Sequence, residues 1–190
     1  MRTKDEIKQQ ALFDATVKLV NEIGFVASSV NKIAKEAKVS PATIYVYYKN
    51  KDDLLISTYI SIKRSLSEAA LAGIDENMPI RSALKKIWYN MFDYISEHTE
   101  YFQYTEQFAN SPYSEQLNPE EIEKHFEPMQ RIIQKGIDQK IIKDVHFDIL
   151  GAFTFYPIMV LANARLSRNL ELTEENIKSA FVLAWDAIKY

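Results

Sequence analysis

The chain has 190 residues, of which 47% are hydrophobic and 26% charged, with four glycines, six prolines and no cysteine. This composition is that of a globular protein, and the lack of cysteine excludes disulfides and cysteine-ligated metal sites. The net charge of −3 is unevenly divided, because residues 1–51 hold nine Lys/Arg and five Asp/Glu, or +4, and the remainder carries −7. A basic segment at the start of an acidic chain suggests that this segment meets a polyanion.

The amino-terminal sequence MRTKDEIKQQ lacks the apolar run of a secretory signal peptide. The longest uncharged stretch runs from Ile149 to Ala164. It is shorter than the roughly 20 residues that span a bilayer, and Pro157 interrupts it. We therefore expect a cytoplasmic protein without a membrane segment, in which this stretch is a deeply buried helix.

The first predicted element is a helix over residues 5–23. Leu12, Ala15 and Leu19 recur at steps of three and four, which places them on one helical face. Gly24 follows, and glycine commonly ends a helix because it accepts the left-handed backbone conformation found there. The segment FVASS that comes next is expected to be a loop.

A helix-turn-helix is predicted over about residues 29–48. Ser29 can cap one short helix through its side-chain oxygen, and Ser40 can cap another after a tight turn. Pro41 stands in the first turn of the second helix, where a missing N–H costs nothing. The short second helix, the basic charge and the tyrosine hydroxyls favour a DNA-binding motif over an ordinary helix pair in a bundle.

The rest of the chain predicts longer helices. Asn50 is expected to cap one that ends at Gly73. Further helices are expected over residues 79–98, 100–110, 118–140 and 147–168, and from residue 173 onward. The predicted fold class is therefore all-α, with about nine helices, no convincing strand and no internal repeat.

The segment SSVNKIAKEAKVSPATIYVYYKNKDDLL, Ser28–Leu55, resembles the TetR/AcrR family of bacterial transcriptional regulators. The matching positions are Ile33, Ala34, Ala37, Val39, Ser40, Thr43, Tyr45, Tyr48, Lys51, Asp53 and Leu54. The resemblance covers residues 5–60, and beyond them it rests on the number and length of the helices. The family often has glycine where Lys38 and Ala42 stand, and these departures are expected to shift the preferred operator.

This resemblance implies a helix-turn-helix DNA-binding domain over residues 1–50 and a ligand-binding and dimerisation domain over residues 51–190. It implies a homodimer on a double-stranded, palindromic operator. The expected role is that of a repressor, released when a small apolar or aromatic effector moves the fourth helix like a lever. No cofactor is expected.

The resemblance places the third helix in the major groove, with its first residues at the base edges. The expected DNA contacts are Ser29, Asn31, Lys38, Pro41, Ala42, Thr43, Tyr45, Val46, Tyr47 and Lys51. Tyr45 and Tyr47 are expected to donate their hydroxyls to phosphates, whereas Tyr48 takes the family's aromatic core position. The alternative is that Tyr45 and Tyr47 also pack among the helices.

Aromatic side chains dominate the second domain, and an apolar pocket with a few polar groups fits between such helices. The expected pocket residues are Trp88, Tyr89, Phe92, Phe102, Tyr104, Gln107, Phe108, Phe126, Met129 and Phe155. The expected dimer face, on the last two helices, comprises Phe153, Pro157, Leu161, Arg165, Phe181 and Trp185. The alternative for both sets is ordinary core packing, because aromatic stripes at helical spacing usually form a core.

Two other classes of function are considered. A helical small-molecule-binding or interaction protein would carry the same helices with an idle DNA-binding head, and salt-dependent affinity for duplex DNA separates the two classes. An enzyme would need a nucleophile motif or a phosphate-binding glycine loop, and the sequence has neither. Glu121 and His125 stand four residues apart, but such a pair lies more often on a surface than at a metal, so no metal site is expected.

Overall fold

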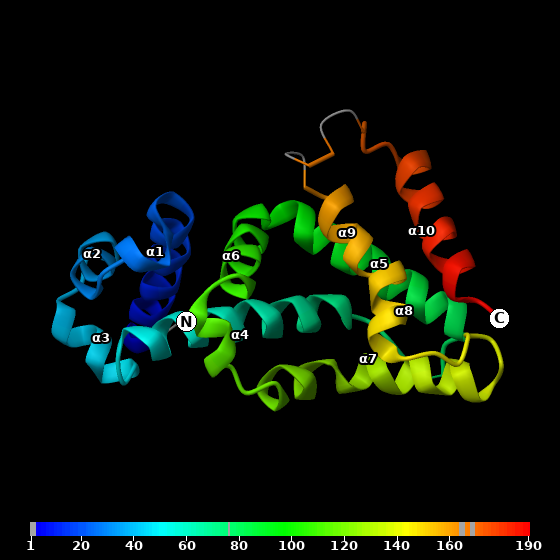
Figure 1. Ribbon diagram of the computed structural model, residues 1–190, viewed down its shortest axis with the longest axis horizontal. Coiled ribbons are helices and arrows are strands. Elements are labelled where there is room, and N and C mark those ends of the chain that lie inside the picture. Colours follow the sequence, from blue (N-terminus) through cyan, green and yellow to red (C-terminus); the bar gives the residue numbers. More distant parts are fainter. Residues whose placement is uncertain (1–2, 76, 164–165, 168–169) are drawn as a thin grey trace. The chain divides into compact units, whose positions relative to one another are not determined.

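The computed structural model describes residues 3–75, 77–163, 166–167 and 170–190. Over these residues the chain forms ten α-helices and one short 3-10 helix (Figure 1). In chain order they are α1 (Lys4–Ala27), α2 (Val30–Glu36), α3 (Pro41–Tyr47), α4 (Lys51–Ala70), α5 (Ile80–Glu97), α6 (Thr99–Ala109), η1 (Pro112–Gln116), α7 (Glu120–Asp138), α8 (Phe147–Thr154), α9 (Tyr156–Leu161) and α10 (Glu174–Ile188). The expected all-α fold class is confirmed.

The described helices divide into two compact units. The first unit contains Met1–Lys63 and Glu100–Ile122, and the second contains Arg64–Thr99 and Glu123–Tyr190. The first unit therefore joins α1, α2, α3 and most of α4 to α6 and η1. None of the helices in the described ranges combines the length and the apolar character that a membrane crossing requires.

The first helix is fixed by local chemistry at its start and kinks near its end. The Thr3 hydroxyl accepts a hydrogen bond from the Glu6 N–H (3.2 Å), and the Glu6 carboxylate accepts one from the Thr3 N–H (2.7 Å). This capping box satisfies two N–H groups that a helix start leaves unpaired. Gly24 has a φ of 77°, so the kink falls where the sequence predicts the end of the helix. The helix resumes after it, which makes the predicted loop shorter than expected.

Side-chain caps begin the next three helices, as the sequence predicts. The side-chain oxygens of Ser29, Ser40 and Asn50 accept hydrogen bonds from backbone N–H groups three residues later, at 3.4, 3.3 and 2.8 Å. Pro41 is the first residue of α3. Each cap replaces a hydrogen bond that the helix itself cannot make. The predicted starts of α2, α3 and α4 are confirmed.

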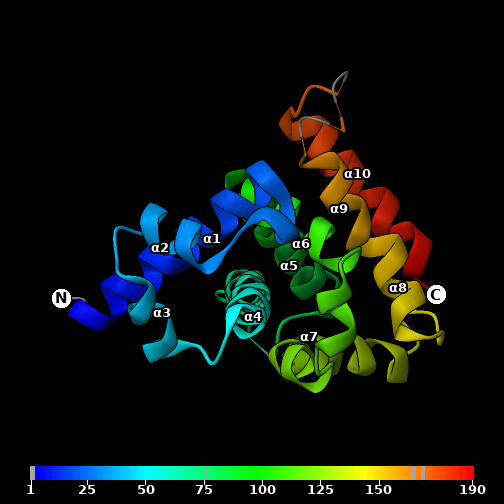
Figure 2. The same ribbon diagram turned by 60° about the vertical axis from the view of Figure 1, so that its left-hand side comes forward.

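One apolar cluster joins α1, α2, α3 and the start of α4. Its buried members are Leu12, Ala15, Ile33, Ala34, Ala37, Ile44 and Leu54. Burying a Leu or Ile side chain contributes roughly 1.5–3 kcal/mol, and helices as short as α2 and α3 do not persist without such packing. α2 packs against both α1 and α3 (Figures 1 and 2).

A second cluster in the same unit brings α6 against α1 and α4. The rings of Tyr59 and Phe108 stack with their centroids 4.2 Å apart. The Tyr104 hydroxyl donates a hydrogen bond to the carbonyl of Leu55 (2.8 Å), and burial raises the pKa of Tyr104 well above its usual value. The helix-turn-helix and α6 therefore belong to one compact unit.

In the second unit, α5 supplies the apolar stripe that the sequence predicts. Its buried residues include Leu84, Ile87, Trp88, Met91, Phe92 and Ile95. The Trp88 indole N–H donates a hydrogen bond to the carbonyl of Thr154 (3.0 Å), which ties α5 to the end of α8. α5 also packs against α9 and α10.

The predicted single helix over residues 147–168 is wrong. The chain breaks at Phe155, so that α8 ends at Thr154 and α9 begins at Tyr156. Pro157 explains the break, because it has no N–H to donate and its ring clashes with the carbonyl four residues earlier. The expected deep burial is also wrong, since Phe153 is 60% exposed.

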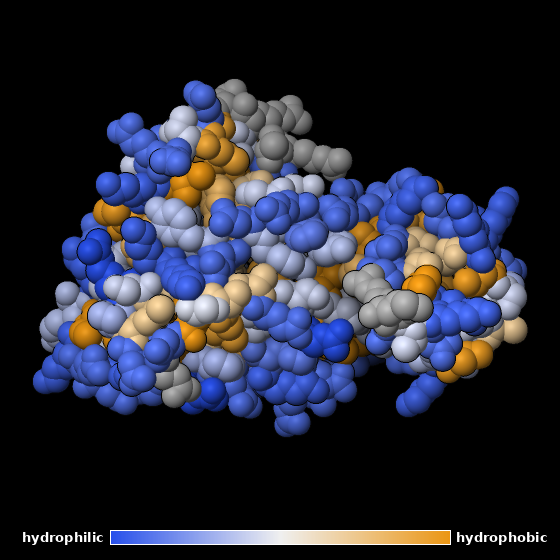
Figure 3. Space-filling model, turned by 180° about the vertical axis from the view of Figure 1, so that it is seen from behind, coloured by the Kyte–Doolittle hydropathy of each residue, from blue (hydrophilic) through white to orange (hydrophobic). Residues whose placement is uncertain are grey.

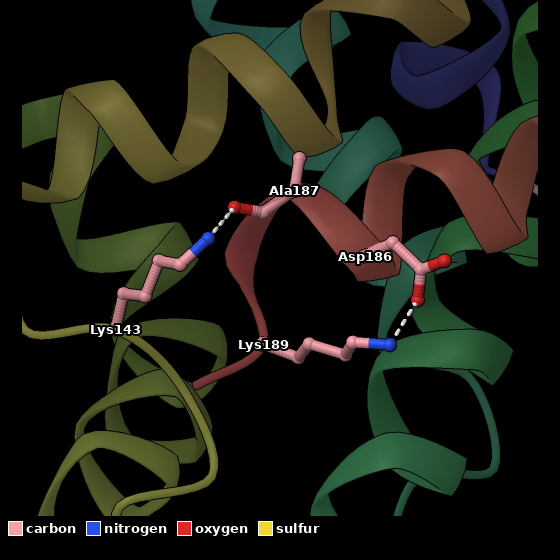
Figure 4. A network of polar contacts seen from close by, with 4 residues as sticks. All are labelled: Lys143, Asp186, Ala187 and Lys189. Atoms are coloured by element: carbon pink, nitrogen blue, oxygen red, sulfur yellow. Dashed lines mark hydrogen bonds and ion pairs between the residues drawn. The ribbon is translucent and has the colours of Figure 1, made fainter.

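The end of α10 is tied to the segment that follows α7 (Figure 4). The Lys143 ammonium donates a hydrogen bond to the carbonyl of Ala187 (2.8 Å), and the Lys189 ammonium donates one to Asp186 (2.7 Å). An isolated antiparallel bridge joins Ile142 to Lys189. A cation at the last carbonyls of a helix complements the helix dipole. The Lys143 contact and the bridge thus hold the end of α10 against the segment that follows α7.

Gly136 allows a direct test of how α7 packs against Ile142 and Ile80. A Cβ at Gly136 would lie 2.5 Å from Ile142 Cδ1 and 3.0 Å from Ile80 Cγ2. We predict that Gly136→Ala lowers the free energy of unfolding by about 1–3 kcal/mol through overpacking, measured by urea denaturation. Gly151 in α8 is the control, because a Cβ there meets no atom within 4 Å. Gly151→Ala should stabilise the protein by up to about 1 kcal/mol, and equal effects of the two changes would contradict the packing described.

Candidate nucleic-acid interface

α3 turns one side into the core and the other outward. Ile44 is fully buried, whereas its neighbours Tyr45 and Val46 are 58% and 73% exposed. At the start of the helix, Pro41 and Ala42 are exposed as well. A tyrosine hydroxyl can donate to a phosphate and a valine can contact a thymine methyl group, so this exposed pair is suited to a nucleic-acid surface.

The first turn of α3 has a polar edge. The hydroxyls of Ser40 and Thr43 share a hydrogen bond at 2.9 Å. A threonine hydroxyl both donates and accepts, so Thr43 retains a second hydrogen bond for a base edge or a phosphate. The sequence placed Thr43 among the DNA-contacting residues, and its half-buried position on α3 leaves it accessible.

The start of α2 brings a lysine close to two exposed polar side chains. Ser29 and Asn31 are both exposed. The Lys32 ammonium donates a hydrogen bond to the carbonyl of Ala27 (3.1 Å), which holds it near the Ser29 cap. Lys32 was not among the residues expected at the interface, because a lysine on an exposed helix has no sequence signal that separates it from a solvated one.

The turn between α2 and α3 contains a lysine in an unusual conformation. Lys38 has a φ of 56°, in the left-handed region. Residues other than glycine pay about 1–2 kcal/mol there, and the exposed ammonium brings a positive charge to the turn. The strain at Lys38 therefore accompanies a charge that a glycine would lack.

Lys51 connects the start of α4 to the end of α1. Its ammonium donates a hydrogen bond to the carbonyl of Phe25 (2.7 Å). An ammonium has three hydrogens, so this contact orients Lys51 and leaves donors for a phosphate. Tyr48 lies half-buried between these helices, and burial, with a smaller effect of Asp53, raises its pKa.

The structure gives Tyr47 a partner that the sequence did not indicate. Its hydroxyl donates a hydrogen bond to the carboxylate of Asp5 in the first turn of α1 (2.8 Å). This hydrogen bond is the main cause of a raised pKa at Tyr47. The two residues stand 42 positions apart in the sequence, so only the tertiary fold brings them together.

The expected pocket residues fall into both compact units. Phe102, Tyr104, Gln107 and Phe108 belong to the first unit, and Trp88, Tyr89, Phe92, Phe126, Met129 and Phe155 to the second. In the first unit Gln107 donates a hydrogen bond to Asn21 of α1 (3.1 Å). In the second unit Trp88 stacks on Phe92 at 5.5 Å, and the Thr154 hydroxyl is buried without a hydrogen-bond partner among the described residues.

The expected dimer residues differ in exposure. Phe153 is exposed, Pro157 and Leu161 are half-buried, and Phe181 and Trp185 are buried against other residues of the chain. Arg165 lies outside the described residues. Leu183 is instead a large apolar residue of α10 that is exposed, at 71%. Figure 3 shows one face of the molecule, on which hydrophobic side chains form patches between hydrophilic ones.

Comparison with known protein families covers both parts of the chain. The protein family described as "Bacterial regulatory proteins, tetR family" matches residues 12–58, and the family described as "Tetracyclin repressor-like, C-terminal domain" matches residues 79–189. The chain belongs to the TetR family. The resemblance of the helix-turn-helix segment is thereby confirmed, and the chain is a helix-turn-helix transcriptional regulator.

Individual TetR family members agree with this assignment. A TetR family transcription regulator from Marinobacter aquaeolei VT8 is 35% identical, with 100% of this chain and 99% of that chain covered and a TM-score of 0.89. An uncharacterized HTH-type transcriptional regulator from Haemophilus influenzae is 25% identical over 99% of this chain and 98% of its own length. The fatty acid metabolism regulator protein of Bacillus subtilis is 48% identical over 52 residues, which are 27% of each chain.

The conformation of Lys38 yields a prediction about stability. Lys38→Gly should raise the free energy of unfolding by roughly 0.5–1 kcal/mol. Glycine removes the strain of the left-handed backbone, and the greater conformational entropy of the unfolded chain offsets part of this stabilisation. Lys35→Gly in the last turn of α2 is the matched control and should lower it by about 1 kcal/mol. Chemical denaturation measures both. A loss of stability in Lys38→Gly would mean that the lysine side chain makes a compensating contact.

Proposed function

We propose that this TetR family member is a repressor that binds a palindromic operator as a homodimer and is released by a small molecule. The outward face of α3 carries the proposal. Its exposed Tyr45 and Val46 follow the fully buried Ile44, within a segment whose net charge is +4. Such a face has the chemistry of a helix that enters the major groove.

The proposed base contacts lie at the start of α3. Pro41 and Ala42 offer apolar contact, Thr43 a hydrogen bond, and Val46 a partner for a thymine methyl. Asn31 on α2 can pair with adenine through its amide. None of these groups is an arginine, so direct readout by each subunit is limited, and two half-sites on one operator would supply the remaining affinity.

The proposed phosphate contacts surround that helix. Tyr45 donates its hydroxyl, Ser29 its hydroxyl, and Lys38 and Lys51 their ammonium groups. The two lysines would release condensed counterions on binding, whereas the two hydroxyls would not. Charged and neutral contacts can therefore be told apart by salt.

A salt titration tests the proposed contacts. Fluorescence anisotropy would follow binding to a mixed-sequence duplex about three helical turns long. We predict that Tyr45→Phe weakens binding about 3- to 10-fold through the lost hydrogen bond, with the salt dependence unchanged. Lys38→Asn should instead make the slope of log K against log salt shallower by roughly 1 per lysine lost.

Tyr190→Phe is the matched control for Tyr45→Phe, because Tyr190 is an exposed tyrosine of the second unit. It should bind the duplex like the wild type. A steeper loss for some sequences than for others in Tyr45→Phe would show that Tyr45 reads bases. Wild-type affinity that does not fall with salt would contradict DNA binding by this chain and favour an idle head.

For the homodimer, the support is exposed apolar surface on α8, α9 and α10. Ile149 and Phe153 on α8, Tyr156 and Val160 on α9, and Leu183 on α10 are exposed large apolar side chains. α8 packs beside α10 (Figure 2). Single exposed apolar residues are normal, but such a number on neighbouring helices indicates a contact surface, and a two-fold axis would let this surface pair with itself.

Charged substitutions on this surface test the homodimer. We predict that Phe153→Asp with Leu183→Asp converts the protein to monomers, because burying two carboxylates against apolar groups is costly. Light scattering measures the mass. Val26→Asp is the control, since Val26 is 92% exposed in the first unit and its change should leave the dimer intact. A dimer that survives the double substitution would place the interface elsewhere.

For the effector, we propose a small apolar or aromatic compound with one polar group. The aromatic side chains of Trp88, Phe92 and Phe155 are buried in the second unit. The Trp88 N–H donates to the Thr154 carbonyl. The Thr154 hydroxyl, which has no partner among the described residues, is the polar group that such a compound would satisfy. The similarity to the fatty acid metabolism regulator protein lies over 52 residues only, 27% of this chain, so it does not define the effector.

The effector proposal is tested with Thr154→Val. A compound of this class should raise the melting temperature and release the duplex, and the substitution should weaken both effects about tenfold in compound concentration. Without compound, Thr154→Val should be at least as stable as the wild type, because it removes a buried hydroxyl that has no partner. An equal response of both proteins would exclude Thr154 as the anchor.

A further inference from the structure

A side chain of the proposed recognition helix is held by a carboxylate from the beginning of the chain. The Tyr47 hydroxyl and Asp5 Oδ1 lie 2.8 Å apart. Tyr47 is the last residue of α3, and Asp5 stands in the first turn of α1. The contact therefore joins the end of one helix to the start of another.

Both partners are fixed by their surroundings. The Thr3–Glu6 capping box sets the first turn of α1 and hence the place of Asp5. The Tyr47 ring packs against the apolar cluster around Ile44. A hydrogen bond between two groups that are already positioned loses little conformational entropy when it forms, and one with a charged acceptor is stronger than one between neutral groups.

Other contacts tie α1 to the remaining helices of the head. Lys18 pairs with Glu36 of α2 at 2.5 Å, and Lys51 at the start of α4 donates to the Phe25 carbonyl. Among the described hydrogen bonds, the Tyr47–Asp5 contact is the one that joins an α3 side chain to another helix. It is thus placed to fix the tilt of α3 on α1.

A tyrosine hydroxyl has a single hydrogen to donate. While Tyr47 donates it to Asp5, it cannot also donate it to a phosphate. A phosphate that replaced Asp5 as the acceptor would bring a second negative charge close to the carboxylate, and like charges at short range repel. The geometry therefore separates the roles of two neighbouring tyrosines.

We propose that Asp5 and Tyr47 form a clasp that positions α3 for DNA, and that Tyr45 rather than Tyr47 is the tyrosine that meets the phosphates. The effect of the clasp on DNA binding rests on the proposed function, whereas the hydrogen bond itself does not. Asp5, although it carries the wrong charge for DNA, contributes to binding by holding the helix that binds.

The first test needs no DNA. The Tyr48 N–H donates to the Ile44 carbonyl (2.9 Å) in the last turn of α3, and its hydrogen exchange reports opening of that turn. Tyr47→Phe and Asp5→Ala should each speed this exchange about 3- to 10-fold, and the double variant should be no faster than either. Asp5→Asn should stay near the wild type, because the amide oxygen still accepts. Unchanged exchange in Tyr47→Phe or Asp5→Ala overturns the clasp.

The second test uses the same mixed-sequence duplex and the same four variants. The clasp predicts that Tyr47→Phe and Asp5→Ala weaken binding by equal factors of about 3 to 10, again without further loss in the double variant. A phosphate contact by Tyr47 predicts the reverse for Asp5, because Asp5→Ala would free the hydroxyl, remove a negative charge and tighten binding. Tighter binding in Asp5→Ala therefore overturns the proposal.

Two further outcomes separate the clasp from the proposed function. If the variants lose stability in urea but bind the duplex like the wild type once folded, the contact is merely structural and the positioning role is overturned. If the wild type binds no duplex while Tyr48 exchange responds as predicted, the proposed function fails and the clasp on α3 is supported.

Discussion

The burial of Ile44 is the constraint on which the rest of the DNA-binding head depends. α3 has seven residues, too few to hold a helix in water by its own hydrogen bonds. The burial of Ile44 in the cluster, with Tyr47 packed against it, keeps the helix folded. Because helical positions are separated by about 100°, fixing Ile44 inward sends Tyr45 and Val46 outward. A core contact thus sets which side chains are offered to a partner.

Polar contacts between the helices add to the packing of the apolar cluster. The Lys18–Glu36 pair and the Lys51 contact with Phe25 lie at the edges of the cluster and run from α1 to its neighbours. The exposed Lys18–Glu36 pair contributes little to stability. The two contacts instead orient the helices, because each limits a rotation of one helix against α1 that apolar packing leaves free. α6 adds a second support, because Tyr104 binds the Leu55 carbonyl and Gln107 binds Asn21 in the same compact unit.

Helix caps and breaks depend on neighbouring residues, so the sequence contains the signal for them. Contacts between distant residues leave no such signal. The caps at Ser29, Ser40 and Asn50 are local, and the structure has all three. The break at Phe155 is local as well, because Pro157 causes it, and the predicted single helix missed it. The partner of Tyr47 lies 42 residues away, and no spacing rule connects it to Asp5. Phe181 is on the predicted side of α10, yet that side faces α5 rather than outward.

The central claim is that the outward face of α3 reads duplex DNA. The most direct measurement is selection of random duplexes by the purified protein, followed by sequencing of the retained molecules. The account predicts an enriched palindrome whose half-sites are one helical turn or a multiple of it apart. A folded, dimeric protein that enriches no sequence would contradict the account and leave a ligand-binding protein with an idle DNA-binding head.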